Sequence, residues 1–171
     1  MKWTNTRIAA LATLLCFTWL RWQGASLYTN ITPRGIVDLE MAADGIRLQQ
    51  LLQLWSKPVV EANIYIDFLF IPAYASLIAG LCSWGGLQLN DLKFRSAGIV
   101  LAKAVWLAAV LDITENMLML FSIRQCYTAL SLQVTVGVAS LKFVLLAIAI
   151  IFILVTGIQT FIQRNNSKNG A

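Results

Sequence analysis

The sequence predicts an all-α integral membrane protein, a four-helix bundle with an additional outer amphipathic interfacial helix. Hydrophobic residues make up 58% of the chain and charged residues only 12%, and the mean hydropathy is +0.71. A soluble domain usually carries about a quarter charged residues. The chain of 171 residues has the size of one ordinary domain, so we expect a single membrane domain over residues 1–171.

Four apolar stretches are long enough to cross a bilayer, whose core about 30 Å thick takes roughly 20 helical residues. They lie at about residues 8–28, 59–84, 97–121 and 134–162. The last two connections are short, so neighbouring helices should pack antiparallel. The first stretch follows Lys2 and Arg7, as the core of a signal peptide does. Because Arg21 and Trp22 stand where small residues would prepare cleavage, we expect this stretch to be a retained span.

The long connection between the first two spans predicts a helix of its own, at about residues 36–55. Its apolar residues recur at helical spacing and form one face, made of Leu48, Leu51, Leu52 and Trp55. Pro33 and Gly35 suit a turn before this helix, and Pro58 should end it. Two positions stay open for it: flat on the membrane surface, or over the outer end of the bundle as a cap.

Basic residues near the ends of the spans favour an orientation with both termini in the cytoplasm. The inner side then receives Lys2, Arg7, Lys93, Arg95, Arg164 and Lys168, and the outer side receives Arg34, Arg47, Lys57 and Arg124. Residues 164–171 are mostly polar, which predicts a disordered cytoplasmic tail.

Several classes of chemistry do not fit this composition. The chain has no histidine, which excludes imidazole-ligated metal sites and histidine-based nucleophile systems. Cys16, Cys82 and Cys126 show no Cys-x-x-Cys spacing, so thiol-redox chemistry is not expected. Basic residues are spread beside apolar runs, which argues against nucleic-acid binding. We therefore expect no cofactor, no metal site and no nucleic-acid partner.

Six charged residues fall inside the predicted spans: Arg21, Asp67, Lys103, Asp112, Glu115 and Lys142. Each needs a reason, because a charge inside a membrane costs several kcal/mol unless it is paired or hydrated. At about 1.5 Å of rise per residue, Arg21, Asp67, Glu115 and Lys142 lie roughly 10–12 Å below the proposed outer ends, and Asp112 lies about one turn deeper. All four helices thus contribute to one layer. Lys103 lies near the inner end and can reach the interface with its stem.

The third predicted span carries the densest polar pattern. Asp112, Glu115 and Asn116 stand at i, i+3 and i+4 and share one helix face. The second span places Tyr74 on the same face as Asp67, and Pro72 between them predicts a kink. These residues predict a polar pocket that has aromatic walls and opens to the outside.

Three segments resemble recurring motifs of uncharacterised four-span bacterial membrane proteins: TPRGIVDLEMA at 32–42, DFLFIPAY at 67–74 and LDITEN at 111–116. The resemblance carries no known activity. It implies that Asp38 and Glu40 belong with the membrane carboxylates, that the outer helix folds over their pocket, and that the protein lies in the bacterial inner membrane.

Four roles for the charged residues stay open. The favoured one is binding of a small molecule or cation in an outward-facing acidic pocket, which for a transporter would require a homo-oligomer or a partner subunit. An accessory subunit that docks on another membrane protein is the second. A lipid-modifying enzyme that uses carboxylates is less favoured, because no Asp-x-x-x-Asp array or nucleophile motif is present, and no catalytic residue is identified. The fourth is a purely structural ion-pair network that holds the helices in register.

Overall fold

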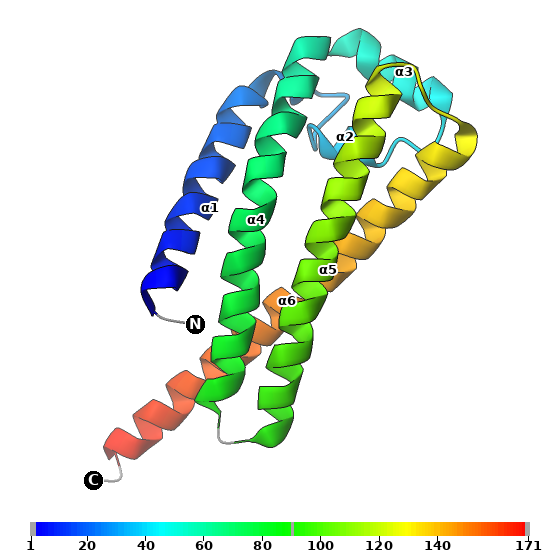
Figure 1. The fold of residues 1–171 in the computed structure, drawn as a ribbon. Coiled ribbons are helices and arrows are strands. Elements are labelled where there is room, and N and C mark those ends of the chain that lie inside the picture. The colour runs from blue at the N-terminus through cyan, green and yellow to red at the C-terminus, as the bar shows by residue number, and fades with distance from the viewer. Residues whose placement is uncertain (1–2, 90, 170–171) are drawn as a thin grey trace.

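The fold is described from a computed structural model, for residues 3–89 and 91–169 (Figure 1). The chain is all-α: 86% of it is helical, and the described residues contain no strand. In chain order the elements are α1 (Trp3–Gln23), the 3-10 helix η1 (Ala25–Leu27), α2 (Val37–Glu40), α3 (Gly45–Leu54), α4 (Lys57–Gln88), α5 (Leu92–Ile123) and α6 (Ala129–Asn169).

Three of these helices, α4, α5 and α6, are long and apolar enough to cross a membrane. They contain the second, third and fourth predicted spans and extend beyond them at both ends. Their length and composition indicate a membrane protein whose apolar helices contact the lipid bilayer. The structure includes Pro72 within α4, which continues as one helix to Gln88.

The first predicted span, 8–28, differs from the structure in two respects. Helix α1 is not among the three long apolar helices, because Arg7 and Arg21 bound a shorter uninterrupted apolar stretch. It also ends at Gln23, and a Cβ at the following residue, Gly24, would lie 2.6 Å from Asn63 Nδ2 of α4. Arg21 therefore lies in the last turn of α1, about 3 Å from its end instead of the expected 10–12 Å.

The predicted helix at 36–55 is wrong as a single helix. It is interrupted at residues 41–44, between α2 and α3. The reason is local: the Asp44 carboxylate accepts a hydrogen bond from the Arg47 backbone N–H at 2.8 Å and starts α3 as its N-cap. The predicted apolar face is present, and Leu48, Leu51 and Trp55 are buried in the core. Helix α3 thus covers one end of the bundle, called here the α2–α3 end.

The helices are arranged so that one side of the bundle is less closely packed than the others. Figure 1 shows α1 beside α4, α5 on the other side of α4, and α6 crossing behind them. Helix α4 packs along α1 and α5, and α6 packs on α5 and α4. No comparable packing joins α1 to α6 within the described residues. The start of α1 and the last turns of α6 lie at the same end, opposite the α2–α3 end.

The core has two apolar clusters with a charged layer between them. The cluster at the α2–α3 end joins Leu48 and Leu51 of α3 to Ile64 of α4 and neighbouring helices. The second cluster surrounds Ile71 and Ala75 further along α4. The intervening turn of α4 carries Asp67, and the corresponding turns of α5 and α6 carry the other charged residues.

The segment predicted to be a disordered tail, 164–171, is helical as far as the structure describes it. Helix α6 continues to Asn169, and residues 170–171 lie outside the described part of the chain.

Candidate ligand-binding site

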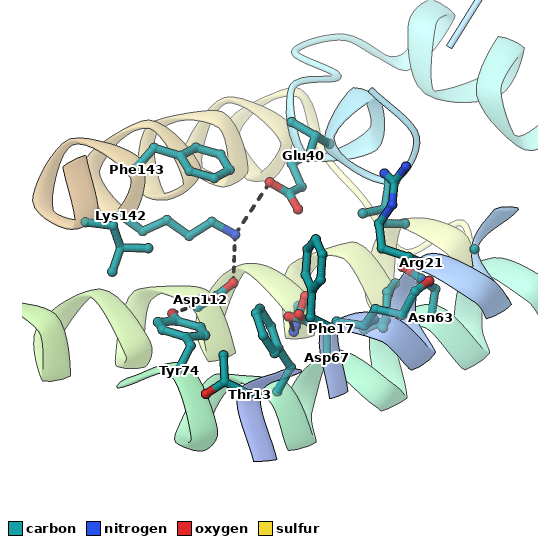
Figure 2. A pocket seen from close by; sticks show the side chains of 18 of the residues that line it. Thr13, Phe17, Arg21, Glu40, Asn63, Asp67, Tyr74, Asp112, Lys142 and Phe143 are labelled. Carbon is teal, nitrogen blue, oxygen red and sulfur yellow. Dashed lines mark hydrogen bonds and ion pairs between the residues drawn. The ribbon is translucent and has the colours of Figure 1, made fainter. Parts of the chain in front are cut away.

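Lys142 of α6 is the centre of the charged layer. Its Nζ lies 2.7 Å from Asp112 Oδ1 of α5 and 3.5 Å from Glu40 Oε2 of α2 (Figure 2). It also lies 2.8 Å from Glu115 Oε2 of α5. The lysine side chain is buried. A buried ammonium of this kind needs several carboxylates around it to compensate for its lost hydration. One side chain therefore connects α6 to α5 and to the segment that covers the bundle.

Asp112 is held on both of its oxygens. The Tyr74 hydroxyl of α4 donates to Asp112 Oδ2 at 2.7 Å, while Lys142 holds Oδ1. The aspartate thus joins α4 to α6 through α5, and both of its oxygens are already occupied by the protein.

Glu115 and Glu40 are buried with incomplete hydrogen bonding. Glu115 is 0% exposed, and within the described structure its Oε1 has no hydrogen-bond partner. Glu40 is 7% exposed, and its Oε2 also lacks a hydrogen bond. Burial raises the pKa of Glu40, and the Lys142 ammonium offsets this rise only in part. The single ammonium leaves negative charge near these carboxyl groups that a proton or a further cation must balance.

Asp67 of α4 differs from Glu40, Asp112 and Glu115 because no cation contacts it in the described part of the chain. Its one side-chain partner there is Asn116 Nδ2 of α5, which donates to Asp67 Oδ2 at 2.7 Å. Three aromatic residues, Phe17, Phe70 and Tyr74, line the same cavity as Asp67. Their rings adjoin one another: the Phe70 centroid is 6.2 Å from that of Phe17 and 5.2 Å from that of Tyr74.

A cavity of about 460 Å³ lies beside Asp67, between α1, α4, α5 and α6. Its volume is in the range of small-molecule sites, about 300–1,000 Å³. The α2 segment covers it with Ile36, Val37 and Glu40. The charged and amide side chains that line it are Arg21, Glu40, Asn63, Asp67, Asp112, Asn116 and Lys142. Most of the remaining lining is aliphatic or aromatic, so the cavity is an apolar chamber with one charged wall.

The predicted site residues separate into two groups. The structure brings together Glu40, Asp67, Tyr74, Asp112, Glu115, Asn116 and Lys142. Arg21 only lines the rim of the cavity, with its guanidinium carbon 4.2 Å from the centre of the Tyr28 ring. Asp38 does not join the carboxylates, because it accepts hydrogen bonds from the backbone and side chain of Arg34, four residues before it. Lys103 is exposed on α5 and stands nine residues before Asp112, so it lies away from the charged layer.

The residues that attach α1 to this site were not predicted from the sequence. Asn63 Nδ2 donates to Gln23 Oε1 at 2.8 Å and to the Leu20 carbonyl at 3.2 Å, and Gln23 Nε2 donates to the Val59 carbonyl at 2.9 Å. A signal was present, because Asn63 precedes Asp67 by four residues and so shares its helix face. Phe17 and Phe143, which also line the cavity, have no comparable signal among so many apolar residues.

No group of three or more histidine, cysteine, aspartate or glutamate residues in the described ranges has the arrangement of a metal site. The Lys142 ammonium lies where the carboxylates converge. Comparison with family models, curated proteins and solved structures found no match to this chain. The resemblance to four-span bacterial membrane proteins therefore stays a prediction. What the arrangement offers chemically is one uncompensated carboxylate, Asp67, on the wall of an otherwise apolar cavity.

Proposed function

We propose that this protein binds a small organic cation in the cavity beside Asp67, within a bacterial inner membrane. The observation that carries the proposal is that Asp67 lines the cavity without a cation partner in the described chain. An ionised carboxylate in so apolar a place is costly unless a positive charge meets it. The adjacent aromatic rings favour an organic ammonium, which gains cation–π attraction from ring faces.

The ion pairs that Lys142 makes with Glu40, Asp112 and Glu115 support a separate, structural role for these three carboxylates. Asp112 uses both of its oxygens on protein partners, and Glu115 is enclosed against Lys142. These residues hold α5, α6 and α2 together, which leaves Asp67 as the carboxylate available to a ligand.

We further propose that α1 is a fourth span and that the α2–α3 end faces away from the cytoplasm. Helix α1 has 21 residues, about 31 Å of helix, which suffices for a bilayer core. Its exposed side carries large apolar residues, including Leu11, Leu14 and Leu15. With this orientation α3 lies at the outer interface and both termini lie in the cytoplasm.

The test is ligand binding by the purified protein in lipid nanodiscs, with benzylammonium as the probe. Calorimetry should detect saturable binding, and Asp67→Asn should weaken it by at least about tenfold, the loss expected for a contact to a charged group. Glu61→Gln is the matched control, because it removes the same charge from α4 at a position that does not line the cavity. Native mass spectrometry of the protein released from the cell membrane should show a bound molecule that Asp67→Asn lacks. Equal binding by wild type and Asp67→Asn would overturn the proposal.

A further inference from the structure

The cavity has two chemically different ends. Its polar end, beneath α2, carries Arg21, Glu40, Asn63, Asp67, Asp112 and Lys142. Its apolar end lies toward the opposite end of the bundle and is lined by Leu77, Ile78, Leu146 and Ile150. Leu77 follows Asp67 by ten residues on the same helix, so the apolar end extends about 15 Å from the carboxylate. A small hydrated cation would leave this end unfilled.

The cavity also opens sideways, toward the surface that contacts lipid. Three residues that line it are at the same time well exposed: Phe17 of α1 at 50%, Phe143 of α6 at 39% and Ile150 of α6 at 46%. They stand on the two helices that lack comparable packing on each other in the described chain. Figure 2 shows Phe17 and Thr13 on one side of the cavity and Phe143 and Lys142 on the other. The gap between α1 and α6 therefore joins the cavity to the apolar surface of the bundle.

The charges at the polar end select the sign of a ligand's headgroup. Lys142 is already surrounded by carboxylates, and Arg21 is stacked on Tyr28 at the rim. A carboxylate or phosphate headgroup inside the cavity would face Asp67 and Glu40, and Glu40 is buried there with an oxygen that makes no hydrogen bond. Two negative groups inside this cavity would repel each other strongly, because the dielectric constant of a poorly hydrated interior is low. An ammonium headgroup would instead be attracted by Asp67 and Glu40.

From this geometry we infer that the ligand is a long-chain amine that enters the cavity sideways from the bilayer, between α1 and α6. Its ammonium contacts Asp67, and its hydrocarbon chain lies along Leu77, Leu146 and Ile150. The inference rests on the proposed function and adds to it the class of ligand and its route. The long-chain ligand and its lateral route are inferred from the apolar end of the cavity and from its lateral opening, since a small water-soluble cation needs neither.

The experiment uses photolabelling in nanodiscs with a dodecylammonium probe that carries a diazirine at the end of its chain. A dodecanoate probe with the same diazirine serves as the matched anion. The amine probe should label peptides of α4 and α6 that line the apolar end. Asp67→Asn should reduce this labelling by at least about tenfold. The dodecanoate probe should label these peptides weakly and equally in both proteins.

A pair of neighbouring substitutions on α6 tests the position of the chain. Ile150→Trp fills the apolar end of the cavity and should abolish labelling there, whereas Ile151→Trp lies outside the cavity lining, at 60% exposure, and should leave labelling unchanged. Both variants should keep the wild-type melting temperature, because neither side chain is buried: Ile150 is 46% exposed and Ile151 is 60% exposed. If Ile150→Trp fails to fold, Phe17→Ala, which widens the lateral opening, should instead speed the uptake of the amine probe.

The outcomes separate this inference from the proposed function. If benzylammonium binds in an Asp67-dependent way but the long-chain amine neither labels the apolar end nor responds to Ile150→Trp, the long-chain ligand is overturned and the cation site stands. If the dodecanoate probe labels as strongly as the amine, the headgroup selection is overturned. If neither amine binds, both proposals fail.

Discussion

Lys142 is contacted by carboxylates from two different elements, and this shared contact gives a single side chain an effect on the whole charged layer. A buried ion pair seldom adds much net stability, since desolvation offsets the attraction between the charges. Removal of one partner is different, because the remaining charges stay buried without compensation. Loss of Lys142 should therefore destabilise the fold much more than the pairing itself stabilises it.

We expect Lys142→Met to lower the free energy of unfolding by about 3–5 kcal/mol, because Asp112 and Glu115 lose their cation. Tryptophan fluorescence during chemical unfolding in detergent would measure this loss. Lys103→Met, at an exposed position of α5, is the control and should change stability by less than about 0.5 kcal/mol. Addition of Asp112→Asn to Lys142→Met should restore part of the stability, and a double variant weaker than Lys142→Met would contradict the ion-pair explanation.

Glu40 makes stability depend on pH. Its pKa is raised by burial, against the partial opposition of Lys142, with Asp112, Glu115 and Asp67 as further charged neighbours. The folded protein then holds the Glu40 proton more tightly than the unfolded chain does. The stability from this proton is complete below about pH 4.3, the ordinary glutamate value, and is lost as the pH rises through the higher pKa of the folded state.

The corresponding variant is Glu40→Gln, which removes the titration and keeps the shape. The stability of wild type relative to Glu40→Gln should decline as the pH rises above about 4.3. Thermal unfolding across a pH series, with both proteins in the same nanodiscs, would measure the difference. Parallel curves for the two proteins would show that Glu40 keeps its ordinary pKa in the fold.

At the scale of single elements, α3 illustrates how a pattern in the sequence becomes packing. Its periodic leucines predicted an apolar face, and that face is buried against α4, α5 and α6. The break at residues 41–44 was not predicted. An aspartate such as Asp44 is equally typical of the first turn of a helix and of an N-cap position. Only the backbone around Asp44 decides between these two.

Two leucines of α3 allow a direct test of its role as a cap. Leu51 is fully buried and Leu54 is 47% exposed. We expect Leu51→Ala to lower the free energy of unfolding by about 2–5 kcal/mol, the usual range for a buried leucine, and Leu54→Ala to change it by less than about 0.5 kcal/mol. Equal effects of the two substitutions in chemical unfolding would mean that α3 is not packed on the bundle.

The whole molecule has one end covered by α2 and α3 and the opposite end where α1 starts and α6 finishes. A native cysteine reports on the orientation of this axis, since Cys126 is exposed in the turn between α5 and α6, while Cys82 is buried. We expect a membrane-impermeant maleimide to label Cys126 in intact cells with a permeabilised outer membrane. A variant with Ser96→Cys and Cys126→Ser should react only after lysis, because Ser96 is exposed near the other end of α5. The opposite pattern would reverse the proposed orientation.

Composition and periodicity alone determined that this chain is helical, that it contains long apolar helices, and that charged residues of several helices lie at similar depth. These features are local, since they depend on the residues within one helix and on the low polarity of the bilayer. Asp112, Glu115 and Asn116 were recognisable together for the same reason, because a helix face is defined by spacing along the chain.

Only the tertiary structure decided how the charges are shared. The sequence offered Arg21 and Lys142 as equal partners for the carboxylates, yet Lys142 takes three of them and Arg21 turns to Tyr28. The resemblance implied that Asp38 and Glu40 both belong with the membrane carboxylates, yet Asp38 pairs with Arg34 and Glu40 lies by Lys142. The physical reason is that an ion pair between helices depends on the crossing of the helices and on where each one ends, and neither is written in the spacing of residues along a single helix. The same crossings leave Asp67, beside the cavity, without a cation partner among the residues that the structure describes.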